Sequence, residues 1–188
     1  LKNYLTYSKS IGLNRITAML GQEMSEYSYK NMRISNTGLP DNSIHNPSLG
    51  SGTPTIQSGF GSGALASAFA RGTYNYNDKY FATYTFRYDG SSNFGPKNRW
   101  APFHAAAISW RISSEDFMSS VKPAISNMKL RLGWGQTGNQ SIGGYRWGAA
   151  ISTMETGLGV GYRQSGIANP YIKWETQQQV NLGLDMSL

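Results

Sequence analysis

The fold is decided by residues 79–112, which read KYFATYTFRYDGSSNFGPKNRWAPFHAAAISWRI. The side chains alternate over residues 82–89, with Ala82, Tyr84, Phe86 and Tyr88 on one face and Thr83, Thr85, Arg87 and Asp89 on the other. A period of two is typical of a β-strand with one apolar and one polar face. Asp-Gly-Ser-Ser at 89–92 favours a turn, so we predict strand 79–89, a polar loop at 90–100 and strand 101–112. Soluble sandwiches and membrane barrels both use such hairpins.

The composition of the 188-residue chain narrows the class of protein. Charged residues make up 14% of the chain, against about 25% in typical soluble domains. Aromatic residues make up 13%, and there are 22 glycines. Few charges with many Tyr, Trp and Gly are typical of an outer-membrane β-barrel, although a secreted soluble β-protein has the same profile. The absence of Cys excludes disulfides, thiolate metal sites and a Cys nucleophile.

The net charge of +7 does not indicate a nucleic-acid partner. A nucleic-acid interface needs basic residues clustered on one element, whereas here they are spread singly along the chain. We therefore interpret them as lumenal or surface residues. No stretch approaches the roughly 18 consecutive apolar residues that a transmembrane helix requires.

Five further segments have strand-like patterns. We predict strands at 1–8, 14–26, 63–76, 128–137 and 173–188, which brings the total to seven. The register of 63–76 is ambiguous, because its alternating alanines compete with Leu65 and Phe69. Ser113-Ser114 before two acidic residues predicts a helical turn within 114–121, ended by Pro123.

The connections between these strands differ in length in a regular way. Segments 28–62 and 138–172 are long and rich in Gly, Ser and Asn, and the second is expected to contain a hairpin around 146–152 and 158–164. In an antiparallel order, the long connections and the 90–100 loop fall at one end, and the short connections 9–13, 76–79 and 113–127 at the other. Outer-membrane barrels sort long outer loops and short periplasmic turns in this way.

The number of strands is odd, whereas single-chain bacterial barrels use even counts. The chain also begins and ends within strand-like segments. We therefore expect these residues to be an all-β, antiparallel segment of a larger transmembrane barrel. A stand-alone structural or carbohydrate-binding β-protein remains the alternative, and detergent dependence discriminates between the two.

Three ordered blocks of sequence carry a resemblance to a known family. They are YDGSSNFG at 88–95 followed by ISWRIS at 108–113, then KLRLGWGQTGN at 129–139, then NPYIKWET at 169–176 with NLGLD at 181–185. Together they resemble the SusC/RagA-type TonB-dependent transporters of the Bacteroidetes outer membrane. Residues 1–70 fit this family in pattern only.

The resemblance implies a 22-stranded barrel with an N-terminal plug and a TonB box. We expect neither part within residues 1–188, which would be a partial barrel with long outer loops at 28–62 and 138–172. It also implies import of an oligosaccharide, a peptide or a similar large solute, with a SusD-like surface lipoprotein and the TonB complex as partners and membrane lipid around the wall.

Candidate site residues fall into two groups. Aromatic residues near strand ends belong to the lipid face or its interfacial girdles, so those of the second long loop are the candidates for ligand binding: Trp147, Tyr162, Tyr171 and Trp174. Charges on strands should face the lumen, because a lipid-facing Arg or Lys costs about 2–4 kcal/mol at the midplane. We expect a structural, lumenal role for Arg87, Asp89, Arg99, Arg111, Arg131 and Asp185.

Catalysis finds no support in the sequence. The two histidines, His45 and His104, are far apart, and neither a nucleophile elbow nor a phosphate-binding loop occurs. Asp41 and its polar neighbours provide too few oxygens for a hard cation, which needs about six or more. We therefore expect no enzyme activity, no metal and no cofactor.

Overall fold

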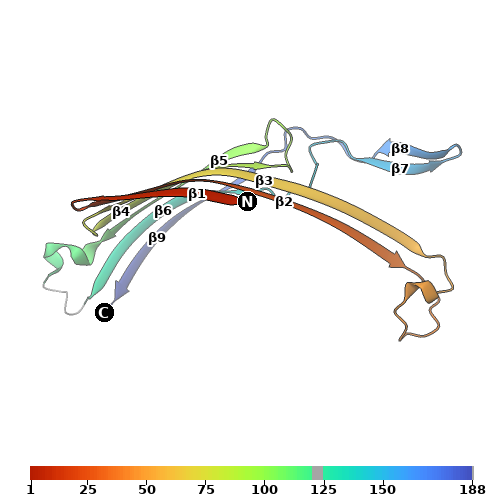
Figure 1. Cartoon of the computed structure of the whole chain (residues 1–188), viewed down its shortest axis with the longest axis horizontal. Helices are drawn as coiled ribbons and strands as arrows, with labels where there is room; N and C mark the ends of the chain where they lie inside the picture. Colours follow the sequence, from red (N-terminus) through yellow and green to blue (C-terminus); the bar gives the residue numbers. More distant parts are fainter. Residues whose placement is uncertain (120–124, 188) are drawn as a thin grey trace. The chain divides into compact units, whose positions relative to one another are not determined.

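The computed structural model describes residues 1–119 and 125–187 (Figure 1). The chain divides into two compact units. The larger comprises Leu1–Ser25 and Ala64–Leu188, and the smaller comprises Glu26–Gly63. The predicted end of a helical turn at Pro123 and the last residue of predicted strand 173–188 lie outside the described residues.

The described residues form strands joined by loops and three short 3-10 turns. The strands are β1 (Lys2–Ile11), β2 (Asn14–Ser35), β3 (Thr55–Tyr76), β4 (Tyr80–Ser91), β5 (Trp100–Arg111), β6 (Asn127–Asn139), β7 (Ile151–Thr156), β8 (Gly159–Gln164) and β9 (Glu175–Ser187). The turns are η1 (Pro47–Leu49), η2 (Ile112–Ser114) and η3 (Asp116–Met118). None of the helical segments described is long and apolar enough to cross a membrane.

Seven strands form one antiparallel sheet in the order β1-β2-β3-β4-β5-β6-β9, and β7 pairs with β8 in a separate two-stranded ladder (Figure 1). The prediction of seven antiparallel strands is therefore confirmed. Neighbouring strands of the sheet are also neighbours in sequence, except that the β7–β8 hairpin is inserted between β6 and β9. Because β1 and β9 are at the two edges, the sheet does not close on itself.

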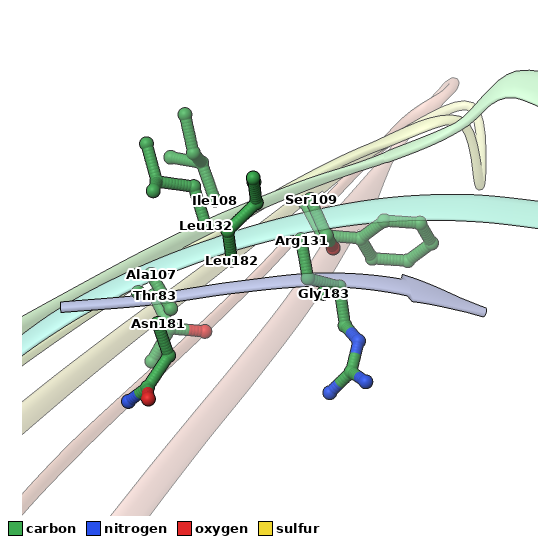
Figure 2. A pocket seen from close by; sticks show the side chains of 11 residues that line it. Thr83, Ala107, Ile108, Ser109, Arg131, Leu132, Asn181, Leu182 and Gly183 are labelled. Atoms are coloured by element: carbon green, nitrogen blue, oxygen red, sulfur yellow. The ribbon is translucent and has the colours of Figure 1, made fainter.

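The register sorts side chains into two faces. Across β4, β5, β6 and β9, one row joins Ala82, Ile108, Leu132 and Leu182, and the next row joins Thr83, Ala107, Gly133 and Asn181. We call the side that carries the first row the apolar face and the other the polar face. Figure 2 shows Ile108, Leu132 and Leu182 pointing to one side of the sheet, and Asn181 and Arg131 to the other.

The apolar face is uncovered in the described residues. Leu182 is 74% exposed and Ile108 59%. Among the large hydrophobic side chains of residues 1–119 and 125–187, only Phe94 and Phe103 are buried. A soluble domain buries such a face against another layer. This sheet therefore has almost no core of its own, and its apolar face requires an apolar environment.

Aromatic pairs bracket the apolar face. Tyr80 stacks on Trp110 with ring centroids 6.4 Å apart, and Tyr88 stacks on Trp100 at 5.2 Å. The eight residue-to-residue steps from Tyr80 to Tyr88 span about 27 Å along the strand at ~3.4 Å each. With a strand tilt of about 40°, the two aromatic bands are roughly 21 Å apart in height, close to the ~25 Å apolar band of a membrane barrel.

The connections of the larger unit alternate between its two ends, as antiparallel order requires. Segments 12–13, 77–79 and the described residues between β5 and β6, 112–119 and 125–126, lie at what we call the turn end, and 92–99 and 140–174 lie at the loop end. Neighbouring turns are joined there, because Asn77 N donates to Leu13 O over 2.7 Å. Asn77 and Asp78 both have φ of 52°, as a type I′ hairpin turn requires.

The smaller unit is a hairpin formed by the last part of β2 and the first part of β3, whereas the sequence predicted a loop there. The prediction that 28–62 lacks regular structure is wrong, because β2 runs to Ser35 and β3 begins at Thr55, leaving a connection of 36–54. Two tyrosine rings lie over facing glycines, Tyr27 over Gly63 and Tyr29 over Gly61. The connection closes on itself through the Asn36 amide, which donates to Pro47 O and Gly50 O.

Other predicted boundaries of loops and strands differ from the observed ones by only a few residues. The prediction of a loop at 138–172 shifts to 140–174, because β6 ends at Asn139 and β9 begins at Glu175. The expected hairpin within it is present as β7 and β8. The predicted turn of helix within 114–121 appears as η2 and η3, which are 3-10 turns. The ambiguous register of 63–76 resolves with Ala68 opposite Tyr88 and Phe69 opposite Arg87.

Candidate ligand-binding site

The loop end is organised by residues 91–95, which begin at the last residue of β4. Ser91 is 1% exposed and Phe94 is fully buried. The Ser91 hydroxyl accepts a hydrogen bond from Asn93 N over 3.2 Å. Ser92 is tied to β3 in both directions, since its N donates to Ala64 O and its hydroxyl accepts from Ala64 N. This polar loop is therefore a fixed platform.

Trp174 packs onto this platform from the far end of the 140–174 connection. Its ring lies 5.0 Å from that of Phe94 and 5.4 Å from that of Phe103, measured between centroids. The indole N–H donates to Arg99 O over 3.0 Å. The Phe103 ring in turn covers Gly138. Trp174, one of the four aromatic candidates for ligand stacking, thus has its ring and its donor occupied within the protein.

Two amides fix both ends of the same connection. Asn93 Nδ2 donates to Gln140 O over 3.1 Å, and Asn98 Nδ2 donates to Pro170 O over 3.3 Å. Together with Trp174 on Phe94 and Phe103, they form what we call the loop clamp. The clamp joins residues up to 80 positions apart in sequence, Phe94 and Trp174.

Trp147 packs on the same platform, but its indole N–H lacks the hydrogen bond that the Trp174 N–H makes. A Cβ placed on Gly95 would lie 3.5 Å from Trp147 side-chain atoms, so the indole rests against that glycine. The Trp147 Nε1 atom is buried and has no hydrogen-bond partner in the described part of the chain, and the same holds for Arg99 Nε and Ser152 Oγ. An unpaired buried polar group costs about 1–3 kcal/mol.

The two remaining aromatic candidates are solvent-exposed. Tyr162, on β8, is 76% exposed, and Tyr171 is 83% exposed. The structure therefore divides the four aromatic candidates: Trp174 is in the clamp, Trp147 rests on its platform, and the two tyrosines are free at the surface. Their role in ligand binding stays a prediction.

The predicted structural charges on strands lie on the polar face. Arg87 pairs with Asp89 at 3.2 Å and also donates to Ser67 Oγ. Arg131 pairs with Asp185 across β6 and β9 at 2.7 Å. Arg111 lies over the Phe81 ring, with its guanidinium carbon 5.5 Å from the centroid. Arg99 differs from these, because it belongs to the 92–99 loop.

The polar face is hollowed between β4, β5, β6 and β9 (Figure 2). The hollow has a cavity volume of about 290 Å³, and its lining includes Thr83, Ala107, Ser109, Arg131 and Asn181. No cluster of metal-ligating side chains occurs in residues 1–119 and 125–187.

Sequence reasoning missed a polar network at the turn end. Glu115 accepts hydrogen bonds from the Tyr80 hydroxyl at 2.7 Å, and from Trp110 Nε1 and Lys79 Nζ at 2.9 Å each. These three donors lower the pKa of Glu115 from 4.5 to about 2, Tyr80 contributing most. The same contact raises the pKa of Lys79. The sequence signalled only an acidic helix start, and the Glu115 side chain makes no cap.

A comparison with protein families decides what this sheet is part of. Residues 2–188 match the family described as TonB-dependent receptor-like, beta-barrel. The chain belongs to this family. Its open seven-stranded sheet is accordingly a piece of a barrel wall, and the all-β fold predicted from the sequence is confirmed.

Relatives within the family agree with this assignment. TonB-dependent receptor P3 of Formosa agariphila is 36% identical over 200 residues, which cover all of this chain and 19% of that protein. TonB-dependent receptor SusC of Bacteroides thetaiotaomicron is 36% identical over 142 residues, which cover 74% of this chain and 14% of that protein. The predicted likeness to SusC is therefore confirmed.

A solved structure shows the same arrangement of strands. A chain of the RagAB peptide importer in its closed-closed state superposes with a TM-score of 0.86 at 28% sequence identity, over 98% of this chain and 21% of that one. The chain thus spans about a fifth of the length of TonB-dependent receptor P3 and of the RagAB chain.

Proposed function

We propose that this chain is a wall segment of a TonB-dependent receptor that imports a large nutrient across the bacterial outer membrane. The observation that carries the proposal is the two-faced sheet with aromatic bands at both ends of its apolar face. In this assignment the apolar face contacts lipid and the polar face lines the lumen. The turn end lies in the periplasm and the loop end outside the cell.

The uncovered apolar face favours a membrane wall over a soluble sandwich. A sandwich covers the inner face of each sheet with a second sheet about 10 Å away. No second sheet covers Ile108, Leu132 and Leu182 in the part of the chain that the structure describes. Lipid supplies the missing layer, and adjoining strands of a complete barrel supply partners for the edges of β1 and β9.

The ion pairs of the polar face act as braces in this proposal. Arg87 with Asp89, and Arg131 with Asp185, hold neighbouring backbone positions without exposing charge to lipid. Arg111 and Arg99 complete the expected set of structural charges.

The residues that select the substrate then lie at the loop end, which carries Trp147, Tyr162 and Tyr171.

The family assignment also suggests the partners. A SusD-like surface lipoprotein would cover the loop end, and the TonB complex would supply energy through parts of the receptor beyond this segment. The solute is a peptide or an oligosaccharide. The name of one relative structure, the RagAB peptide importer, supports the first, and the likeness to SusC is compatible with either.

Uptake by cells that carry the full-length receptor tests the proposal. Fluorescently labelled peptides and oligosaccharides are supplied to the native strain, to a strain lacking the receptor gene and to a strain lacking TonB. We expect uptake of one class only when both receptor and TonB are present. Equal uptake by all three strains, for every solute supplied, contradicts the proposal.

A further inference from the structure

Two cations on the polar face lie directly opposite each other near the turn end. Arg111 of β5 is the register partner of Lys129 of β6. Both approach the same ring, because the Arg111 guanidinium carbon lies 5.5 Å from the Phe81 centroid and Lys129 Nζ lies 4.5 Å from it. Like charges directly opposite each other in an antiparallel pair destabilise a sheet. The pair of Arg111 and Lys129 would therefore be stabilised by an anion between them.

The described residues supply no such anion. Asp185 lies opposite Lys129 in the register, but its carboxylate pairs with Arg131 at 2.7 Å. Neither Arg111 nor Lys129 forms an ion pair in the described part of the chain, and residues 120–124 contain no Asp or Glu. Arg111 Nε is also buried without a hydrogen-bond partner among the described residues. The two cations are thus left uncompensated, apart from their contact with the Phe81 ring.

The hollow of the polar face provides space beside this pair (Figure 2). Phe81, Ser109 and Arg131 line the part of the hollow that is nearest the turn end. The Arg131 guanidinium lies against the backbone of Gly183, since a Cβ there would come within 3.3 Å of Arg131 Nη2. An anion that enters the hollow there would meet two uncompensated cations next to one neutral ion pair.

We propose that Arg111 and Lys129 form a binding site for the carboxylate of an Asp or Glu side chain, supplied by a part of the receptor outside residues 1–188. The inference rests on the proposed function, in which the polar face lines the lumen. A carboxylate has two oxygens, so it can accept hydrogen bonds from a guanidinium and from an ammonium at the same time. Phe81 is the positioning residue, because its ring holds both cations over one spot.

The location of the pair favours an anion from the receptor itself. Lipid contacts the other face of the sheet in this assignment, so headgroup phosphates do not reach the pair. A dissolved anion binds from dilute solution, and salt screens its attraction to the two cations. A carboxylate on the same chain is present at an effective concentration of about millimolar. The chain covers 19% of TonB-dependent receptor P3, so most of a receptor of that length is available to supply it.

The first test is the sign of a change in stability. In the purified full-length receptor, Lys129→Met keeps an unbranched side chain over Phe81 and removes one charge. With a carboxylate in the site, the melting temperature should fall, because that carboxylate loses a partner. Without one, removing a like charge beside Arg111 should leave the melting temperature unaltered or raise it, and the inference is wrong. Lys97→Met is the control and should have no effect, since Lys97 is exposed in the 92–99 loop.

The second test identifies the carboxylate. A carbodiimide joins an amine to a carboxylate without a spacer, so it links only groups that are in contact. Mass spectrometry of the digested receptor then identifies the joined peptides. We expect Lys129 to be linked to an Asp or Glu outside residues 1–188, and this link should be absent from Lys129→Arg, which keeps the charge but has no reactive amine. The Lys79–Glu115 pair, at 2.9 Å, is the internal control in both samples.

Three results overturn the inference. The first is a link from Lys129 to Asp185 alone, which would mean that the wall compensates its own charge. The second is the absence of any Lys129 link in a sample that contains the Lys79–Glu115 link. The third is a melting temperature that inorganic phosphate raises in the wild type and not in Lys129→Met, which would assign the site to a free anion.

These measurements do not depend on transport. Each overturning result leaves TonB-dependent uptake intact, so it is distinguishable from failure of the proposed function, in which no solute is taken up in a TonB-dependent way.

Discussion

Glu115 is the residue that holds the turn end together, because a single carboxylate accepts from Lys79, Tyr80 and Trp110. Two of these donors are aromatic side chains at the end of the apolar face. Their polar groups turn toward Glu115 while their rings stack on each other at 6.4 Å. In the membrane orientation proposed above, this network places the Lys79–Glu115 ion pair at the periplasmic interface.

The lowered pKa of Glu115 makes the stability of the receptor depend on pH. A carboxyl whose pKa falls from 4.5 to about 2 on folding stabilises the folded state fully above pH 4.5. That contribution decreases as the pH falls from 4.5 and is lost below about 2. We expect the melting temperature of the detergent-solubilised receptor to fall more steeply over this range in the wild type than in Glu115→Gln.

At pH 7 the same variant should be less stable than the wild type, because its neutral amide accepts weaker hydrogen bonds than a carboxylate. Asp116→Asn is the matched control, since the described residues give Asp116 no ion pair. Equal pH profiles for the wild type and Glu115→Gln would show that Glu115 does not carry the effect.

At the scale of elements, β5 and β6 approach closely where the Phe103 ring covers Gly138. A Cβ on Gly138 would collide with that ring. We expect Gly138→Ala to destabilise the receptor by about 1–3 kcal/mol, the usual cost of forcing atoms into a packed site. The melting temperature of the purified receptor measures this loss.

Gly72→Ala in β3 is the control, because a Cβ there meets nothing within 4 Å. It should be neutral or slightly stabilising, since it only removes the conformational freedom of a glycine. Replacing Phe103 with Leu in the Gly138→Ala background should recover part of the loss. An unaltered melting temperature in Gly138→Ala would mean that Phe103 has another position in the native barrel.

The strands could be predicted from sequence where the two faces differ in chemistry. Residues 82–89 alternate between apolar and polar, and the predicted strand 79–89 corresponds to β4. Residues 27–35 could not be assigned this way, because Tyr27 and Tyr29 are stabilised by facing glycines that leave no apolar pattern. Only the partner strand reveals why this stretch is extended.

The aromatic residues of the loop end could be recognised from the sequence, but the contacts that they make could not be predicted. The aromatic content of the second long loop drew attention to Trp147 and Trp174. Their different environments depend on Gly95, Phe94 and Arg99, which lie about 50 to 80 positions away in sequence. The alternation of apolar and polar residues shows which side chains share a face of one strand, so it cannot predict contacts between segments far apart in sequence.

At the scale of the whole molecule, the sheet depends on surroundings that the isolated segment lacks. Its apolar face is exposed and the edges of β1 and β9 are unpaired in the described sheet. Free edges and exposed apolar surface promote aggregation. We therefore expect residues 1–188, expressed alone, to aggregate in plain buffer and to require detergent.

Size-exclusion chromatography and thermal melting in detergent-free buffer check this expectation. The complete receptor, handled in the same detergent, is the reference for a folded barrel. A soluble, monomeric segment with one cooperative melting transition in plain buffer would contradict the assignment of this sheet to a membrane wall.

The near absence of a core has a consequence for how this sequence can vary over time. Only Phe94 and Phe103 are buried large hydrophobic residues in the described chain. A residue of the apolar face such as Leu182 must therefore be apolar to contact lipid, but it does not have to fill a space between neighbouring side chains. Exchanges among Leu, Ile, Val and Phe should be tolerated there. Intolerant positions should gather at the loop clamp and at Glu115. Relatives can thus diverge widely along the wall while these few positions keep the same architecture.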